Sequence, residues 1–260
     1  MNITVLIKHV VDSTEVRFDK NTGELSLRGL PEKISDYDKN AIEEAIRLKS
    51  KFGGTVTAIS FGKKDAIKSL KEAVAMGADN GILISNPQFE QIYDPFYIAK
   101  VLGKGIEKVD NCDLVFCGDM SEDITNKIVG PMLATNIGFN YVPNVSKISI
   151  EGNSKFIALC EIDGYEIEVE ASFPAVISVS RKLNEPRLAT KIQIMKVQSK
   201  KISTMTLEDI GMTENIADES ACLFESFTPI TKERKHVIFD GDAANTVKEL
   251  INTLKQEKVL

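Results

Sequence analysis

Through its first 140 residues the sequence alternates between short apolar runs and longer amphipathic segments. The apolar runs have the length of a β-strand and lie at residues 3–10, 55–61, 81–85 and 114–117. The amphipathic segments carry apolar residues at helical spacing and lie at residues 36–52, 64–76 and 95–109, with a further one through Ile128, Met132 and Leu133. Strands that are apolar on both faces and separated by helices indicate a mostly parallel sheet covered on both sides. The sequence therefore predicts a Rossmann-like, three-layer α/β fold with right-handed crossovers.

From about residue 145 the pattern changes to alternation of apolar and polar residues. Three such segments predict antiparallel strands, at residues 145–150, 155–161 and 165–171. They are joined by the turn signals Glu151-Gly152-Asn153 and Asp163-Gly164. The apolar run 173–179 predicts a strand that returns to the main sheet. Earlier in the chain, residues 16–27 predict a protruding β-hairpin, because Asp19-Lys20-Asn21-Thr22-Gly23 supplies turn chemistry.

The regular pattern lapses after Arg181. Residues 183–201 predict a polar loop or short helix, 204–235 an extended arm, and 246–257 a terminal amphipathic helix. We expect three divisions. Residues 1–185 form an α/β domain with an antiparallel insertion at about 145–171, residues 186–202 form a loop, and residues 203–260 form a C-terminal arm with its helix.

The charge balance excludes several functional classes. Lys plus Arg number 32 against 38 Asp plus Glu, a formal net charge of −6, which argues against a broad nucleic-acid or acidic-membrane surface. Every apolar run is far shorter than the roughly 20 residues that a membrane-spanning helix needs. The first residues have the pattern of a strand, without the basic segment or cleavage site of a secretory signal. We therefore expect a cytoplasmic protein with no nucleic-acid partner and no membrane span.

Cysteine and histidine supply little chemistry here. The four cysteines, Cys112, Cys117, Cys160 and Cys222, form no C-x-x-C pair, and neither His9 nor His236 stands at ligand spacing from them. We expect no metal site, three buried thiols and one surface thiol. His9 follows the first strand, where a hydrogen-bonded wall residue is the expected role.

The loops after the predicted strands are candidate binding positions, because open α/β sheets bind ligands beyond the carboxyl ends of their strands. Four segments qualify, at residues 8–12, 60–63, 117–123 and 129–131. Backbone amides and helix N-termini at such places meet anions. The alternative is that these are ordinary connections. The sequence has no G-x-G-x-x-G, no G-x-x-x-x-G-K-[ST] and no G-x-S-x-G, which argues against a dinucleotide fingerprint, a phosphate-transfer loop and a nucleophile elbow.

Two acidic pairs have structural interpretations. Glu43-Glu44 are consecutive in a predicted helix and do not face one cleft, so we expect a solvated helix face. Glu122-Asp123 lie where a helix is expected to open, so we expect them to cap it. The basic stretch ending at Lys200-Lys201 lacks interleaved aromatics, which favours a protein-docking loop over nucleic-acid contact.

Five ordered motifs resemble the β subunit of electron transfer flavoproteins, and the resemblance spans essentially the whole chain. They are Ile34-Ser35-Asp36-Tyr37-Asp38 with Ala41-Ile42-Glu43-Glu44-Ala45, Ala75-Met76-Gly77-Ala78-Asp79, Glu161-Ile162-Asp163-Gly164, Phe173-Pro174-Ala175-Val176, and Leu183-Asn184-Glu185-Pro186-Arg187-Leu188-Ala189-Thr190 followed by Ile194-Met195-Lys196. Finer features, Gln88-Phe89-Glu90-Gln91, Cys117-Gly118-Asp119 and residues 236–242, are similar to the FixA-like branch, which is associated with anaerobic reduction of acyl-CoA substrates.

The resemblance implies an adenine-nucleotide-binding fold and a heterodimer. A larger α subunit would hold the redox FAD, and this β subunit would hold AMP or a second FAD. The family's nucleotide loops would fall on Lys8, His9, Val10, Ser35, Asp36, Asp38, Gly62, Cys117, Gly118, Asp119, Asp123, Lys127, Ile128, Val129 and Gly130. The side chains at 119–130 match neither the AMP-type nor the electron-bifurcating pattern, although 129–131 agrees with the bifurcating one. Backbone amides near Val129 and Gly130 would receive the phosphate.

The resemblance also implies a loop that recognises an acyl-CoA dehydrogenase or reductase. Its candidate contact residues are Glu185, Pro186, Arg187, Leu188, Lys191, Ile192 and Met195. Lys191 and Ile192 stand where many members carry an anchoring leucine and a proline, so docking would be polar or shifted to Leu188 or Ile192. The C-terminal arm and helix would pack on the α subunit, and electrons would pass through flavins with no catalytic side chain from this chain.

Three alternatives stay open from the sequence. Within the family, the chain is a bifurcating subunit that oxidises NADH at its own FAD. Outside it, the chain is an ATP-cleaving enzyme of the same layered fold, although residues 8–13 offer no Ser-Gly-Gly phosphate loop. The last alternative is a non-redox, adenine-nucleotide-binding regulatory module.

Overall fold

The fold comes from a computed structural model. The structure describes residues 1–19, 25–27, 29–89, 92–109, 111–152, 154–199, 202–212, 222, 225 and 235–260. The chain divides into two compact units, Met1–Ser226 and Phe227–Leu260. The first unit holds the central sheet and the candidate site.

Among the described residues, nine strands form one sheet in the order β11-β10-β9-β12-β8-β1-β6-β7-β13. They are β1 (Asn2–Leu6), β6 (Thr55–Gly62), β7 (Asn80–Ser85), β8 (Leu114–Gly118), β9 (Asn140–Glu151), β10 (Lys155–Ile162), β11 (Tyr165–Ser172), β12 (Ala175–Val179) and β13 (Ser203–Met205). In this order, each pair of neighbouring strands in the stretch β9-β12-β8-β1-β6-β7-β13 is parallel. The winding proceeds from β1 through β6 to β7, then crosses to β8 on the other side of β1. This crossing makes the gap between β1 and β8 the topological switch point of the sheet.

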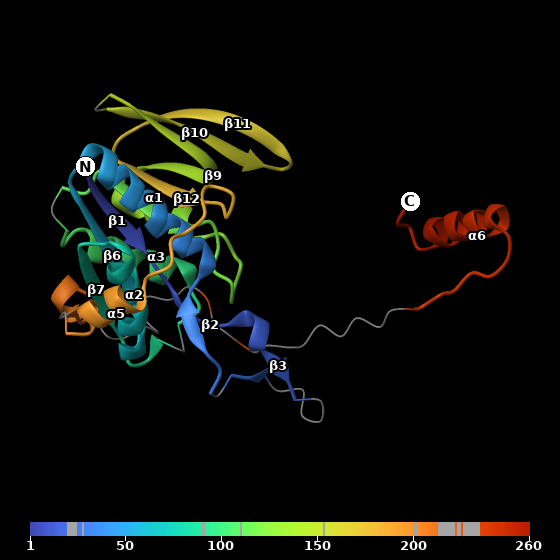
Figure 1. Ribbon diagram of the computed structural model, residues 1–260, viewed down its shortest axis with the longest axis horizontal. Coiled ribbons are helices and arrows are strands. Elements are labelled where there is room, and N and C mark those ends of the chain that lie inside the picture. The colour runs from blue at the N-terminus through green and yellow to red at the C-terminus, as the bar shows by residue number, and fades with distance from the viewer. Residues whose placement is uncertain are drawn as a thin grey trace. The chain divides into compact units, whose positions relative to one another are not determined.

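Helices cover both faces of the parallel part, as predicted. They are α1 (Asp36–Phe52), α2 (Ile67–Met76), α3 (Pro95–Ile106) and α4 (Val129–Ile137). Side chains of α1 and α2 share one apolar core with Val5 of β1, whereas those of α3 and α4 share a second core with Leu6. Alternate residues of a buried strand therefore face different helical layers. Figure 1 shows α1 and α2 in front of the sheet, and the three-layer prediction is confirmed.

The antiparallel strands predicted after residue 145 are confirmed, at the top of Figure 1. They continue the main sheet, because β9 begins at Asn140 and its first half pairs in parallel with β12. Its second half pairs antiparallel with β10, and β10 with β11. The predicted turn residue Asn153 lies outside the described residues. The strand predicted to return to the main sheet is β12, between β8 and β9.

Two small sheets flank the large one. Strands β3 (Arg17–Phe18) and β4 (Leu25–Ser26) pair antiparallel and confirm the predicted hairpin, although its turn at 20–23 lies outside the described residues. Strands β2 (His9–Val11) and β5 (Glu32–Ile34) pair antiparallel as well.

The single strand predicted over residues 3–10 is wrong. β1 ends at Leu6, and the chain re-enters a different sheet as β2. The reason lies at Lys8, whose backbone N–H donates to the carboxylate of Asp38 at 2.7 Å and is therefore not used in strand pairing. A side chain from the first turn of α1 thus ends the strand.

The extended arm predicted from residue 204 is wrong for its first part. β13 adds in parallel to the edge strand β7, and the short 3-10 helix η4 (Glu208–Ile210) follows it. Leu207, Ile210 and Met212 are buried in the core under α3. Burial of these apolar side chains holds this segment on the sheet. Most of the predicted arm after Met212 lies outside the described residues.

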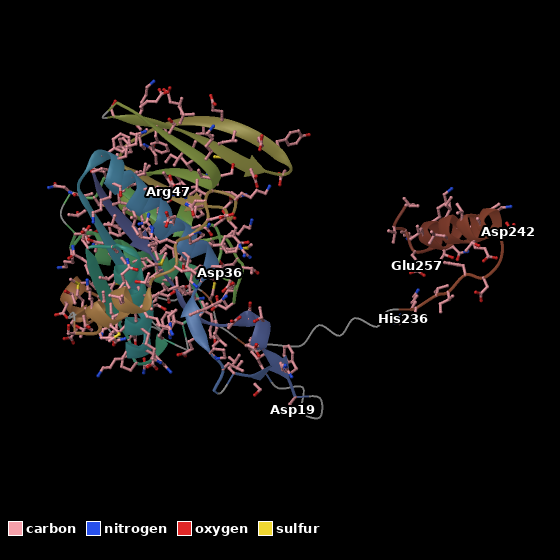
Figure 2. All side chains as sticks on the ribbon, viewed as in Figure 1. Asp19, Asp36, Arg47, His236, Asp242 and Glu257 are labelled. Atoms are coloured by element: carbon pink, nitrogen blue, oxygen red, sulfur yellow. The ribbon has the colours of Figure 1, made fainter. Side chains whose placement is uncertain are left out.

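Two further helices complete the chain. The segment predicted as a loop or short helix contains α5 (Lys191–Gln198), which packs against α2, and Lys200 and Lys201 lie outside the described residues. The predicted terminal helix is confirmed as α6 (Ala243–Gln256), which belongs to the second unit. Asp242 caps it by accepting from the backbone N–H groups of Ala244 and Asn245. Asp242 and Glu257 mark its two ends in Figure 2.

Candidate functional site

A cavity of about 770 Å³ lies at the carboxyl ends of β1, β6 and β8. This is the switch point of the sheet, where open α/β folds place their ligands. Lys8 follows β1, Gly62 ends β6 and Gly118 ends β8, and all three line the cavity. The volume falls within the range of about 300–1,000 Å³ found for small-molecule sites.

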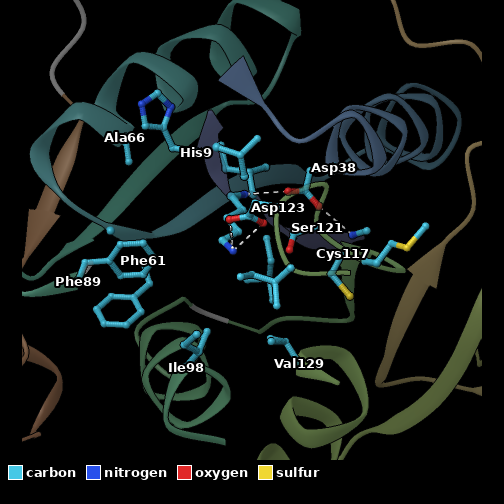
Figure 3. A pocket seen from close by; sticks show the side chains of 18 of the residues that line it. His9, Asp38, Phe61, Ala66, Phe89, Ile98, Cys117, Ser121, Asp123 and Val129 are labelled. Atoms are coloured by element: carbon cyan, nitrogen blue, oxygen red, sulfur yellow. Dashed lines mark hydrogen bonds and ion pairs between the residues drawn. The ribbon is translucent and has the colours of Figure 1, made fainter. Parts of the chain in front are cut away.

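One flank of the cavity is apolar. Phe61 and Phe89 pack edge to face there, with ring centroids 5.1 Å apart and an interplanar angle of 84°. Ile92, Ile98 and Leu102 continue the same flank. Figure 3 shows the two phenyl rings and Ile98 on the side of the cavity away from Asp38. Such a wall suits a flat heterocycle, because ring faces pack well against aromatic and branched side chains.

The opposite flank is polar, and its lysines are ion-paired. Lys8 Nζ lies 2.7 Å from Asp123, and Lys127 Nζ lies 2.8 Å from Asp119. Asp119 is buried and also accepts from Ser178 Oγ at 2.9 Å. Its hydrogen bond raises the pKa of Lys127, so this lysine carries its charge at neutral pH. The lysines therefore attract anions while adjacent carboxylates offset their charge.

Asp38 joins two strand ends beneath this polar flank. Its Oδ2 accepts from Lys8 N at 2.7 Å and its Oδ1 from Gly118 N at 3.0 Å. The side chain comes from the first turn of α1 and is buried. Burial raises the pKa of Asp38 from 3.8 to about 7, against the lowering effect of the two N–H groups. Both carboxylate oxygens are used on backbone, so Asp38 shapes the cavity wall.

This geometry predicts a stability difference that depends on pH. The folded pKa of Asp38 is raised, so its stabilising contribution is fully present below pH 3.8 and is lost as the pH rises to about 7. An Asp38→Asn variant lacks this titration. We expect the free energy of unfolding of the parent to fall, relative to that of the variant, by about 1.4 kcal/mol per pH unit across this window. Urea unfolding at pH 5, 6, 7 and 8 measures the difference, and a constant difference would contradict the prediction. Asp65→Asn, at a carboxyl whose side chain is 64% exposed, is the control.

The N-terminus of α4 opens onto the cavity. Val129 and Gly130 line it, and the N-cap residue Ile128 makes no side-chain capping bond. The first N–H groups of a helix have no partner within the helix and carry its positive dipole end. Tight packing leaves little room there, because a Cβ added at Gly130 would lie 3.2 Å from Tyr141 and 3.3 Å from Cys117 Sγ. The arrangement can hold a phosphate through backbone alone.

The structure brings together most of the predicted nucleotide-contact residues. Those that line the cavity are Lys8, His9, Val10, Asp38, Gly62, Cys117, Gly118, Asp119, Asp123, Lys127, Ile128, Val129 and Gly130. Ser35 and Asp36 lie outside its lining. Ser35 is buried at the start of α1, and its Oγ has no hydrogen-bond partner among the described residues. Asp36 forms an ion pair with Lys33 at 3.2 Å.

His9 has the expected wall position. Its ring bonds Ser69 Oγ at 2.8 Å and Glu32 at 3.1 Å. Cys117 and Cys160 are buried and Cys222 is exposed, as predicted, whereas Cys112 is only half-buried. Burial raises the pKa of the Cys117 thiol, so this cysteine is unreactive at neutral pH.

Sequence reasoning missed the apolar flank. Phe89, Ile92 and Ile98 come from the loop after β7 and from α3, neither of which was a candidate segment. The available signal was an apolar pair in a loop, at Phe89 and Ile92, where solvated residues are the norm. Glu90 and Gln91, which carry part of the family resemblance, lie outside the described residues.

The interpretation of Glu43 and Glu44 as a solvated face is wrong. They are only 4% and 8% exposed. Arg187 forms an ion pair with Glu43 at 2.7 Å, and Asn184 Nδ2 donates to Glu44 at 3.0 Å. Residues from a loop far along the chain cover this part of α1, and no local sequence pattern predicts this contact.

The interpretation of Glu122 and Asp123 as helix caps is also wrong. They lie in a turn that precedes α4, which begins only at Val129. Glu122 pairs with Lys33 at 3.2 Å and Asp123 with Lys8. Lysines near the ends of β1 and β5 attract these carboxylates and hold the turn at the cavity rim.

The predicted recognition segment combines a tethered part with exposed apolar side chains. Arg187 is tied to α1, whereas Leu188, Ile192 and Met195 are 88%, 67% and 74% exposed. The remaining candidates Glu185, Pro186 and Lys191 lie on the same segment, with Lys191 and Ile192 in the first turn of α5. Thr190 and Gln193 form a capping box that starts this helix.

Metal-binding clusters and membrane-spanning helices are absent from the described part of the chain. No group of three or more His, Cys, Asp or Glu side chains there is arranged to hold a metal ion. No described helix combines the length and apolar character that crossing a bilayer requires.

Comparison with known proteins identifies the family of this chain. The family model of the electron transfer flavoprotein domain matches residues 23–210. The electron transfer flavoprotein subunit beta of Thermoanaerobacterium thermosaccharolyticum is 38% identical over 264 residues, 100% of both chains. That of Clostridium acetobutylicum is 33% identical over 260 residues, 99% of each chain. A subunit of the caffeyl-CoA reductase-Etf complex of Acetobacterium woodii is 30% identical over 264 residues, 100% of both chains. The chain therefore belongs to the electron transfer flavoprotein family, in its beta-subunit group, and its role is in electron transfer.

Proposed function

We propose that this chain is the nucleotide-holding β subunit of a heterodimeric electron transfer flavoprotein. It works with an α subunit that holds the redox FAD, and it passes electrons between a donor and an acyl-CoA dehydrogenase or reductase. The observation that carries the proposal is the cavity at the switch point, which joins an apolar flank to a helix N-terminus. The similarity to β subunits over the whole chain supports the same role.

The residues present fit an adenine nucleotide. The apolar flank around Phe61 and Ile98 suits a purine ring, and the amides of Val129 and Gly130 suit a phosphate. Lys8 and Lys127 line the same cavity as the helix N-terminus and add positive charge to it. A flavin, when bound in the heterodimer, supplies the redox chemistry, and this chain supplies orientation, exclusion of water and docking. No proton transfer is asked of Asp38, because both its oxygens already bind backbone N–H groups.

Partner choice follows from the relatives. One relative is named as a subunit of a caffeyl-CoA reductase-Etf complex, and another as an electron transfer subunit of acryloyl-CoA reductase. We extend this to the present chain as docking to an acyl-CoA dehydrogenase or reductase through residues 183–198. The exposed apolar side chains of that segment give it the character of an interface anchor.

A second candidate is an electron-bifurcating subunit that holds its own FAD and oxidises NADH. The size of the cavity favours it, because about 770 Å³ lies in the upper part of the range for small-molecule sites. Leu102 also lines the cavity and adds to the apolar surface available to a ring system. The two candidates differ in the nucleotide bound by this chain.

The test is the nucleotide content of the heterodimer. The chain is co-expressed with its α subunit and purified, and the nucleotides released by denaturation are identified by chromatography and absorbance. One FAD with one AMP supports simple transfer, and two FAD support bifurcation. If the chain recruits no flavoprotein, the result supports a non-redox regulatory module instead. A heterodimer that releases one FAD and no further adenine nucleotide would contradict nucleotide binding by this chain.

A further inference from the structure

Glu43, a buried acid of α1, holds the segment that carries the exposed apolar side chains. We infer that Glu43, supported by Asn40 and Glu44, is a positioning residue for docking, because it fixes residues 183–190 in the conformation that a partner enzyme meets. We call residues 183–190 the anchored loop. The inference rests on the proposed function, since docking to an electron-transfer partner gives the anchored loop its purpose. It assigns a role to acids that lie away from the cavity.

Glu43 grips Arg187 through side chain and backbone together. Its Oε2 accepts from Arg187 Nε at 2.7 Å and from the Arg187 backbone N at 3.1 Å, while Oε1 accepts from Nη2 at 3.0 Å. The side chain of Glu43 is 5% exposed, whereas that of Arg187 is 44% exposed. Such a fork fixes direction as well as distance, which a single lysine contact does not.

A second set of contacts, between Asn40, Glu44 and Asn184, holds the start of the anchored loop. Asn40 Nδ2 donates to the backbone oxygen of Asn184 at 2.7 Å, and Asn184 Nδ2 donates to the backbone oxygen of Asn40 at 3.0 Å. Asn184 Nδ2 also lies 3.0 Å from Glu44 Oε2. Asn40 is 3% exposed. Asn40, Glu43 and Glu44, three buried positions of α1, thus hold two residues of the anchored loop.

The anchored loop has no helix or strand of its own. Leu183 and Ala189 of this loop pack against the core, but Leu188 follows Arg187 directly and is 88% exposed, so its own burial does not fix its position. Fixing a free backbone costs conformational entropy at each residue, and a partner that met an unordered loop would bear that cost on binding. The contacts with α1 order the loop before a partner binds, so the partner does not bear this cost. In Figure 2, Asp36 and Arg47 mark the part of α1 that carries Glu43.

A purely structural role is a poor account of this acid. A buried ion pair adds little net stability compared with apolar residues of similar volume, because desolvation offsets the attraction. What the pair adds is a single orientation for Arg187 and therefore for Leu188. The burial of Glu43 raises its pKa and the hydrogen bonds from Arg187 lower it, with a net shift below the ordinary value. The pair stays charged at neutral pH.

The chain offers a matched control at Arg47. This residue also pairs with Glu43, at 3.1 Å, but it is on α1 itself, and among the described residues its ion pairs are with acids of α1. Glu43→Gln weakens the grip on Arg187 and keeps the shape of the side chain. Arg47→Ala removes the ion pairs with Glu43 and Glu44 and leaves the Arg187 contact in place.

The experiment compares these variants in the purified heterodimer. With an acyl-CoA dehydrogenase that the parent accepts, Glu43→Gln is expected to raise KM for the dehydrogenase about tenfold, whereas reduction of a small dye acceptor keeps the parental rate. Arg187→Ala is expected to have the same effect, and the double variant is expected to be no worse than either. Arg47→Ala is expected to keep the parental KM. Equal KM values in Glu43→Gln and Arg47→Ala would overturn the inference.

Hydrogen exchange gives a readout that needs no partner. The amide of Arg187 donates to Glu43, so its exchange is expected to become faster in Glu43→Gln and to stay parental in Arg47→Ala. Equal exchange in both variants would overturn the inference. Faster exchange in Glu43→Gln together with a parent that transfers electrons to the dye but to no dehydrogenase would contradict the proposed function and leave the anchoring itself supported.

Discussion

A Gly118→Ala variant is expected to lose its bound nucleotide and to unfold with a free energy about 2 to 4 kcal/mol below that of the parent. A Cβ at this position would lie 2.6 Å from Asp38 Oδ1 and 2.6 Å from Tyr37 Cβ. Neither neighbour can retreat easily, because Asp38 is tied to two backbone N–H groups and Tyr37 Cβ belongs to the first turn of α1. The end of β8 must then move away from α1 and change the cavity wall. Urea unfolding and the nucleotide content of the heterodimer measure the two effects.

Gly62 provides the control for this prediction. It ends β6 at the same cavity, but a Cβ there meets only Ala66 Cβ, at an ordinary 3.5 Å. Gly62→Ala is therefore expected to keep its nucleotide and to change the free energy of unfolding by less than about 1 kcal/mol. If the two alanine variants behave alike, the close approach of β8 to α1 controls neither the nucleotide content nor the free energy of unfolding.

An Asp38→Ala variant is expected to be destabilised by about 2 to 5 kcal/mol at pH 6. The substitution leaves the backbone N–H groups of Lys8 and Gly118 without their acceptor, and each unpaired buried donor costs about 1–3 kcal/mol. The ends of β1 and β8 lose the group that joins them, so nucleotide affinity is expected to fall with stability. Thermal unfolding is expected to shift down by about 2–4 °C for each kcal/mol.

Asp123→Ala is the matched control for Asp38→Ala. Asp123 lines the same cavity and also contacts Lys8, but through the exposed ammonium group and not through the backbone. An exposed ion pair contributes about 1 kcal/mol or less. We expect Asp123→Ala to leave the melting temperature within a few degrees of the parent. A larger loss in Asp123→Ala than in Asp38→Ala would show that the lysine pair, and not the joined strand ends, maintains the site.

The sequence was sufficient for elements whose signals are local. α1 has its predicted bounds because apolar residues repeat at helical spacing up to Gly53, which has a φ of 73° and ends the helix. The break after β1 was not predictable in the same way. It depends on Asp38, which lies 30 residues away along the chain and competes for the N–H of Lys8. β13 was missed because three residues of edge strand show too little pattern to recognise.

The position of the candidate site was predictable, and part of its content was not. Parallel strands place their carboxyl ends at one edge, so the loops at Lys8, Gly62 and Gly118 had to meet there. The apolar flank depends on how α3 and the loop after β7 pack, which no short motif encodes. The burial of Glu43 depends on Arg187, 144 residues later, and sequence spacing alone gives no reason to pair them.

The helix α1 touches two separate parts of the molecule with acids that are only five positions apart, Asp38 at the strand ends and Glu43 at the anchored loop. Adding or deleting one residue between them would swing one acid around the axis by about 100° relative to the other. Either the strand ends or the loop would then lose their carboxylate. Related chains can therefore vary in the residues on the outer surface of this helix, but not in the number of residues between the two acids.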